Sequence, residues 1–193
     1  FEKMLYDQAL LAIAYLEAHQ LTGEALFART AREIFAYVAE RLTAPEGAFF
    51  TAEDADSEGE EGRFYVWSQD ELGRILGAET AATWARILSF QAEGNFLEEA
   101  TRQRTGANIP HLTRPLDTWA KTLDRDPAAL EAEWVAVRRR LAEIRAQRVR
   151  PLRDDKVLTD WNGLMIAALS VGARVLDRDV FADSARRAVD FIE

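Results

Sequence analysis

The chain has 193 residues, with 33 Asp or Glu against 24 Lys or Arg, so its formal net charge is −9. This charge argues against general binding to nucleic acids or to anionic membranes. The absence of cysteine excludes a disulfide framework, a thiol nucleophile and a cysteine zinc site within the chain. The longest apolar run, Ala9 to Leu16, is well short of the about 20 residues that span a membrane, and we expect a cytoplasmic protein.

Two helices of different character are predicted near the start of the chain. Residues 9–16 are apolar on every side of a helical projection, as expected for a helix enclosed by its neighbours. Residues 26–38 carry an apolar stripe on one side only, which is typical of an amphipathic helix. Thr22 and Gly23 separate the two helices. We therefore predict an antiparallel helical hairpin over residues 3–42.

The middle of the chain mixes strands, helices and loops. Residues 47–51 and 63–67 are aromatic and β-prone, and an acidic segment with glycines separates them, which predicts a β-hairpin insertion over residues 47–67. Helices are predicted over residues 68–149, where Ser68 with Glu71 forms a capping box and Asp126 before Pro127 opens a long helix. Residues 91–114 and 149–158 are predicted loops.

Residues 159–193 repeat the pattern of the first hairpin. Residues 163–169 are apolar all round, residues 181–192 are striped, and the two hairpins align without a gap at an offset of 154 residues. Chance similarity between two alanine-rich hairpins is the alternative. Repeated inner and outer helices stack into α/α toroids or solenoids. The predicted fold class is mainly α, a partial α/α toroid of antiparallel helical hairpins with a small β-hairpin insertion, in one incomplete domain over residues 1–193. Because the chain opens on Phe1 and stops inside a helical pattern, we expect a piece of a longer protein.

The acidic segment holds the densest charge in the chain. Its opening imitates a calcium loop, but Tyr65 stands where that loop needs a glutamate, so we do not expect calcium binding. The carboxylates Glu53, Asp54 and Asp56 either form a solvated hairpin tip or turn inward over a cavity. In a cavity, a close pair of carboxylates can divide the acid and base roles of catalysis. The flanking aromatic side chains either pack in the core or stack on a sugar ring.

Polar side chains also gather where the two apolar helices begin. In a ring of hairpins the starts of the inner helices reach the same mouth, so these groups would converge on one cavity. The alternative is N-capping, which Asp and Asn do routinely. A tryptophan beside an amide suits polyol binding better than capping. The residues are Lys3, Tyr6, Asp7 and Gln8 at the first helix, and Asp160, Trp161 and Asn162 at the last.

A third charged stretch runs from Arg148 to Lys156. Its arginines either bind phosphate through paired N–H donors or form the solvated end of an outer helix. The sequence has no glycine-rich phosphate loop, and its two histidines, His19 and His111, lie in different contexts. We expect neither a metal nor a cofactor.

Four strings resemble signatures of the YyaL-type, spermatogenesis-associated thioredoxin-domain proteins. They are residues 1–9 (FEKMLYDQA), 47–67 (GAFFTAEDADSEGEEGRFYVW), 93–96 (EGNF) and 150–164 (RPLRDDKVLTDWNGL). The resemblance implies a thioredoxin-like domain with a Cys-x-x-Cys-type site, which this chain lacks, followed by an α/α toroid similar to six-hairpin glycosidases and N-acylglucosamine epimerases. The family commonly has Thr-Ser-Trp-Asn-Gly where this chain has Asp160, which favours Trp161 and Asn162 over Asp160 as site residues.

The leading hypothesis is a carbohydrate-related role at a carboxylate-lined central cavity: sugar binding, hydrolysis or epimerisation. The candidate acid and base groups are Asp7, Glu53, Asp54 and Asp56, and the candidate substrate-binding groups are Lys3, Tyr6, Arg63, Trp67, Trp161 and Asn162. The expected partners are a small-molecule sugar and the thioredoxin-like domain of the same full-length chain. The rival hypothesis is a non-catalytic binding or scaffold domain serving a thioredoxin module, and a third is a protein-interaction solenoid using its outer face.

Overall fold

A computed structural model describes residues 1–98 and 102–193. The described part is mainly helical, with eight α-helices and a small antiparallel β-hairpin, so the predicted fold class is confirmed at that level. None of the helices in the described ranges is both long and apolar enough to cross a membrane. The chain divides into two compact units, residues 1–55 with 151–193, and residues 56–150. Residues 99–101, in the loop predicted over 91–114, lie outside the described part.

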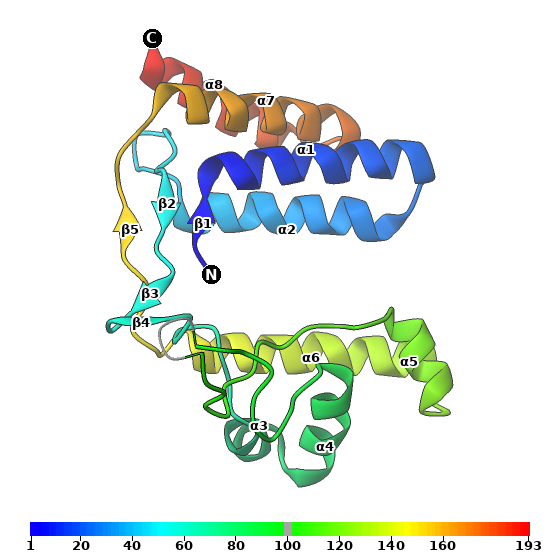
Figure 1. Ribbon diagram of the computed structural model, residues 1–193. Helices are drawn as coiled ribbons and strands as arrows, with labels where there is room; N and C mark the ends of the chain where they lie inside the picture. Colours follow the sequence, from blue (N-terminus) through cyan, green and yellow to red (C-terminus); the bar gives the residue numbers. More distant parts are fainter. Residues whose placement is uncertain (99–101) are drawn as a thin grey trace. The chain divides into compact units, whose positions relative to one another are not determined.

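Two helical hairpins build the first unit. Helix α1 (Leu5–Thr22) packs against α2 (Ala25–Arg41), and α7 (Thr159–Leu176) packs against α8 (Asp179–Ile192). The hairpins meet through α1 and α7, which lie side by side in Figure 1. The buried core of this unit runs along that seam, with Leu5, Leu16 and Met165 fully buried. Inner and outer helices therefore alternate as the pattern predicts, while closure into a toroid stays a prediction.

The internal repeat is visible in the element boundaries. The same offset of 154 residues separates the first residues of α1 and α7, their last residues, and the first residues of α2 and α8. It also relates the caps, because Gly23 and Asp177 both end their helices in the left-handed conformation. Glycine adopts that conformation freely, and aspartate is among the few other residues that tolerate it. The matching bounds and caps make the two hairpins structural repeats of each other.

The strands lie elsewhere than the aromatic pattern predicts. Strands β3 (Asp56–Ser57) and β4 (Glu60–Glu61) form the hairpin inside the acidic segment, and residues 47–51 and 63–67 do not pair with each other. The physical reason is burial, because Phe49 belongs to the core of the first unit and Trp67 to that of the second. Strands β1 (Lys3–Met4), β2 (Ala52–Glu53) and β5 (Arg153–Asp154) form a separate antiparallel sheet in the first unit, beside the starts of α1 and α7 (Figure 1). The loop predicted over 149–158 thus contains a short strand.

The second unit has its own core of tryptophan and aliphatic side chains. Helix α3 (Gln69–Leu76) begins with the predicted capping box and packs against α4 (Ala78–Ile87). Helix α5 (Leu116–Thr122) packs against the long α6 (Pro127–Arg145), which Asp126 caps as predicted. The rings of Trp84 and Trp134 stack in this core, with their centroids 5.3 Å apart.

The carboxylate of Glu133, on α6, forms hydrogen bonds at the edge of this core. It accepts hydrogen bonds from Trp84 Nε1 at 2.6 Å and from the Arg125 guanidinium at 2.5 Å. The bond from Arg125 lowers the pKa of Glu133, and partial burial opposes it. Because the folded-state pKa lies below the ordinary value, this stabilisation is present above the unfolded-state pKa of about 4.3 and is lost as the pH falls through the folded-state value.

Glu133→Ala is therefore expected to lower the free energy of unfolding of the second unit by about 1–3 kcal/mol at pH 7. The variant leaves the N–H of the fully buried Trp84 without its acceptor. Urea unfolding followed by tryptophan fluorescence measures the loss, which should shrink below about pH 4. Glu143→Ala, an exposed carboxylate on the same helix, is the matched control and should change stability by less than about 0.5 kcal/mol. A loss that did not vary with pH would contradict the role of the ionised carboxylate.

Candidate functional site

A three-stranded sheet brings together three of the four family-like strings. Strand β1 comes from residues 1–9, β2 from 47–67 and β5 from 150–164. Met4 pairs with Ala52, and Ala52 pairs with Asp154 on its other side. Strand β2 is held further by its backbone, since Asp54 N donates to Leu152 O at 2.8 Å and Thr51 N to Lys156 O at 3.0 Å. Segments distant in sequence thus meet in one ladder.

The alternation of the strands sorts the candidate residues onto two faces. Successive side chains of a strand point to opposite faces, and cross-strand partners share a face. Met4, Ala52 and Asp154 form one row, and Asp54 follows Ala52 on the same face. Lys3, Glu53 and Arg153 form the other row. Glu53 and Asp54, adjacent in sequence, therefore point to opposite faces of the sheet.

A pocket of about 440 Å³, which we call the sheet pocket, is lined by residues of this sheet and of the first turn of α7. The strand face supplies carboxylates and a lysine, and the first turn of α7 supplies an aromatic wall. The pocket is lined by Glu2, Met4, Thr51, Ala52, Asp54, Leu152, Arg153, Asp154, Lys156, Leu158 and Trp161. This volume falls in the range of small-molecule sites, about 300–1,000 Å³.

Trp161 is the aromatic side chain of the sheet pocket. Its indole is partly buried and meets the Tyr6 ring edge to face, with centroids 4.8 Å apart at 69°. Such a contact is one of the preferred aromatic geometries and restrains the orientation of the ring. Tyr6 is on α1 and Trp161 on α7, so the seam between the inner helices positions the ring.

An ion pair lies within the sheet pocket. Lys156 Nζ is 2.9 Å from Asp154 Oδ2, and the backbone N–H of Lys156 donates to Asp154 Oδ1 at 3.2 Å. The hydrogen bond from the lysine lowers the pKa of Asp154, with smaller contributions from the backbone donor and Thr51. The same pair raises the pKa of Lys156. Asp154 is thus held ionised at neutral pH and offers acceptors only.

Glu53 and Lys3 lie on the opposite face of the sheet. Glu53 is 1 % exposed, and its Oε2 accepts a hydrogen bond from Arg41 Nε at 3.0 Å. Lys3 Nζ donates to the backbone carbonyl of Phe1 at 2.7 Å. Neither side chain lines the sheet pocket. This ion pair joins the last residue of α2 to strand β2.

Asn162 is fully buried, and its side-chain amide forms hydrogen bonds with backbone groups. Its Oδ1 accepts from Phe49 N at 2.8 Å, and its Nδ2 donates to Phe49 O at 2.9 Å and to Leu158 O at 3.0 Å. The side chain therefore clasps residues 47–51 to the start of α7. Its partner in the predicted pair, Trp161, lies one residue away and faces the sheet pocket instead.

The remaining candidates are not brought to the sheet pocket. Asp7 is exposed in the first turn of α1 and is absent from the pocket lining. Asp56, Arg63 and Trp67 belong to the second unit. There, Arg63 pairs with Glu58 at 3.0 Å and with Glu60 at 2.8 Å. Trp67 is buried beneath a guanidinium, that of Arg148, whose carbon lies 3.9 Å from the ring centroid.

The string at 93–96 has a structural role. Asn95 Nδ2 donates to the carbonyls of Ser89 and Ile109, and Asn95 Oδ1 accepts from Ile109 N. At Gly94, with φ +91°, a Cβ atom would lie 2.5 Å from the carbonyl oxygen of Ala107. This motif therefore folds a loop in the second unit.

Sequence reasoning missed Asp154 and Lys156 as site residues. The sequence predicts a charged loop there, because residues 153–156 are all charged and show no alternation of apolar and polar side chains. Their position became visible only through the pairing of β5 with β2, which no local pattern indicates.

Comparison with known proteins identifies relatives along the whole chain. The human protein "Spermatogenesis-associated protein 20" is 33% identical over 210 aligned positions, covering 100% of this chain and 27% of the human protein. The rat protein of the same name is 30% identical with the same coverage, and an uncharacterized protein of Caenorhabditis elegans is 27% identical over 209 positions. The chain thus spans about a quarter of the length of these relatives. No protein-family model matches it. The resemblance inferred from the four strings is confirmed.

Proposed function

We propose that this relative of spermatogenesis-associated protein 20 binds a carbohydrate or a similar polyol in the sheet pocket. The observation that carries the proposal is the combination of a partly buried indole with charged hydrogen-bonding groups in one pocket of about 440 Å³. The apolar C–H face of a sugar ring packs on an aromatic face, while its hydroxyls need donors and acceptors nearby. Trp161 provides the face, and Asp54, Asp154 and Lys156 provide the polar partners.

The charges of the sheet pocket suit a neutral, hydroxyl-rich ligand. Asp154 and Lys156 largely neutralise each other, so the pocket offers strong acceptors and donors without demanding a charged ligand. Hydrogen bonds from hydroxyls to charged groups are stronger than those between neutral groups. Tyr6 takes part as the support of Trp161.

The two carboxylates also support a hydrolytic role for the same pocket. Asp154 opposes Ala52 in the ladder, so Asp54 and Asp154 are diagonal neighbours on one face of the sheet, and the Cα atoms of such neighbours lie about 7–8 Å apart. Inverting glycoside hydrolysis uses two carboxyl groups about 6.5–9.5 Å apart, one as acid and one as base. Asp54 and Asp154, which both line the pocket, would divide these two roles between them.

Isothermal titration calorimetry of the chain against a panel of neutral mono- and disaccharides tests the proposal. We expect at least one sugar to bind with one-to-one stoichiometry. Trp161→Ala and Asp54→Asn should each weaken it by about tenfold or more, because each removes a contact worth more than about 1.4 kcal/mol. Asp190→Asn, the same chemical change on α8 outside the pocket lining, is the matched control and should bind normally.

The outcomes separate binding from catalysis. Absence of any binding, or binding that Trp161→Ala and Asp54→Asn leave unchanged, would refute the sugar site. NMR of the bound disaccharide over time detects hydrolysis, and an inverted anomer released first would support the Asp54–Asp154 pair. An intact sugar after long incubation would leave a binding site and remove the hydrolytic role.

The exposed acidic hairpin of the second unit favours a second candidate function. Asp56, Glu58 and Glu60 are exposed along the β3–β4 hairpin, where a partner protein can reach them. We propose this hairpin as the contact for a thioredoxin-like domain of the full-length protein. Charge reversal at Glu58 and Glu60 should weaken co-purification of a separately expressed thioredoxin-like domain with this chain, and unchanged co-purification would refute it.

A further inference from the structure

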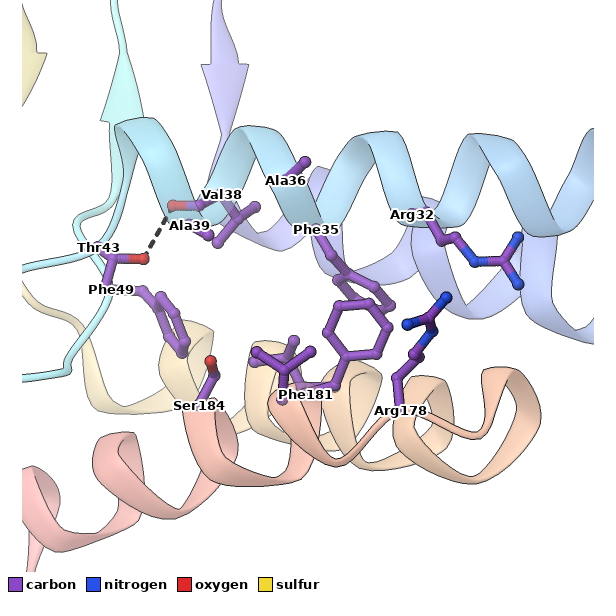
Figure 2. A pocket seen from close by; sticks show the side chains of 12 residues that line it. Arg32, Phe35, Ala36, Val38, Ala39, Thr43, Phe49, Arg178, Phe181 and Ser184 are labelled. Carbon is purple, nitrogen blue, oxygen red and sulfur yellow. Dashed lines mark hydrogen bonds between the residues drawn. The ribbon is translucent and has the colours of Figure 1, made fainter.

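A second pocket, of about 300 Å³, lies between α2 and α8 and shares no lining residue with the sheet pocket. Figure 2 shows it from close by: the rings of Phe35 and Phe181 lie against each other, with Phe49 toward the other end. The two rings are 4.8 Å apart between centroids. We call it the interhelix pocket. Its interior is apolar, completed by Val38 and Leu169.

The hydroxyls of the interhelix pocket are already used inside the fold. Thr43 Oγ1 donates to Val38 O at 2.9 Å, the bond drawn in Figure 2. Ser184 Oγ accepts from the Arg187 guanidinium at 3.1 Å. The interior therefore suits the hydrocarbon part of a ligand.

Two arginines stand at one end of this apolar space. Arg32 comes from α2 and Arg178 immediately precedes α8, and Figure 2 shows both beside the Phe35–Phe181 pair. Among the described residues, neither guanidinium has a carboxylate within ion-pairing distance. Asp177 and Asp179 flank Arg178 in sequence but do not line the pocket. In a chain of net charge −9, two unpaired cations at one pocket mark a local positive site.

The start of α8 adds to this positive end. Val180 and Phe181, in the first turn of the 14-residue helix, line the pocket beside Arg178. The N-terminal end of a helix carries a partial positive charge that favours anions.

We propose that the interhelix pocket binds an apolar carboxylate, such as a medium-chain fatty acid, with the hydrocarbon between α2 and α8 and the carboxylate on Arg32 and Arg178. The pocket has about twice the volume of a roughly 150 Å³ protein cavity that takes up benzene, which leaves room for a chain of several methylenes. Guanidinium groups bind carboxylates through paired, charge-assisted hydrogen bonds. Because the two arginines lie at one end of the pocket only, the expected ligand has an apolar chain and a single anionic group.

Calorimetric titration with decanoate and with decanol, both below their aggregation limits, separates the two parts of the proposal. Decanoate is expected to bind one molecule per chain, and decanol about tenfold or more weaker, because it lacks the charge that the arginines recognise. Arg32→Gln with Arg178→Gln should bring decanoate down to the affinity of decanol and leave decanol unchanged. Raising the salt concentration should weaken decanoate selectively.

Matched variants locate the site. Arg174→Gln, an exposed arginine on α7 outside the pocket lining, should leave both affinities unchanged. Ala39→Phe is expected to fill the pocket and abolish binding of both compounds, and Ser184→Leu serves the same purpose from α8 if the first variant does not fold. Equal binding of decanoate and decanol, several molecules per chain, or normal binding by a folded pocket-filling variant would overturn the proposal.

Discussion

Asn162→Ala is expected to lower the free energy of unfolding of the first unit by about 3–5 kcal/mol. The substitution leaves the backbone N–H and carbonyl of Phe49 without partners in a place closed to water. Each buried unsatisfied group costs about 1–3 kcal/mol, and the bond to Leu158 O is lost as well. The effect is far larger than that of an exposed amide, which usually changes stability by less than about 0.5 kcal/mol.

Hydrogen exchange read by mass spectrometry measures this loss where it arises. Peptides covering residues 47–51 and 159–165 should exchange faster in the variant, and peptides from α6 in the second unit should keep their wild-type protection. Thr159→Ala, an exposed change in the same helical turn, is the control. Wild-type protection of Phe49 in Asn162→Ala would contradict the clasp and return Asn162 to the list of ligand-binding candidates.

Arg148→Ala is expected to destabilise the second unit by about 2–4 kcal/mol. Its guanidinium donates to Val66 O at 2.7 Å and Phe64 O at 2.9 Å, and it is 3.2 Å from Glu71 Oε1. It also lies 3.9 Å above the centre of the Trp67 ring. Burial lowers the pKa of Arg148, but the guanidinium stays charged because the ordinary pKa of arginine is far above neutral pH. One side chain thus holds residues 63–67 against the end of α6.

Arg148→Lys should rescue little of this loss, because an ammonium cannot donate to several carbonyls in a plane and stack on a ring at once. Urea unfolding followed by tryptophan fluorescence measures both variants. Arg139→Ala, with a side chain that is 78 % exposed on the same helix, is the matched control and should cost less than about 0.5 kcal/mol. Full stability of Arg148→Lys would show that charge alone accounts for the contact.

Arginines between Arg148 and Lys156 therefore make contacts within the protein, which differs from the phosphate binding that the sequence pattern suggested. Arg148 is occupied by carbonyls and an indole, and Arg153 lies over the Phe50 ring at 4.2 Å and donates to Arg41 O at 3.3 Å. From the sequence, these arginines either bind phosphate or are solvated. In the structure they instead donate hydrogen bonds to backbone carbonyls and stack on aromatic rings. Arginine suits these contacts because its planar fork meets several acceptors at once.

The sequence by itself determined the features that depend on neighbours along the chain. The helical hairpins, the capping box at Ser68 and the cap at Asp126 were all predicted, because periodicity and capping act within one or two turns. The repeat at an offset of 154 residues was readable for the same reason. So was the relationship to spermatogenesis-associated protein 20, which rests on contiguous strings.

Only the tertiary structure decided which candidate residues meet. The pattern placed Glu53 with Asp54 and Trp161 with Asn162, but neighbours in a strand face opposite sides, and successive residues at the start of a helix point in different directions. Asp54 and Trp161 therefore line the sheet pocket, while Glu53 and Asn162 are buried inside the fold. Asp154 joins them from about a hundred residues away through a ladder between distant strands. The sequence identifies the types of side chain. Which side chains meet depends on strand pairing and burial, and these depend on the whole fold.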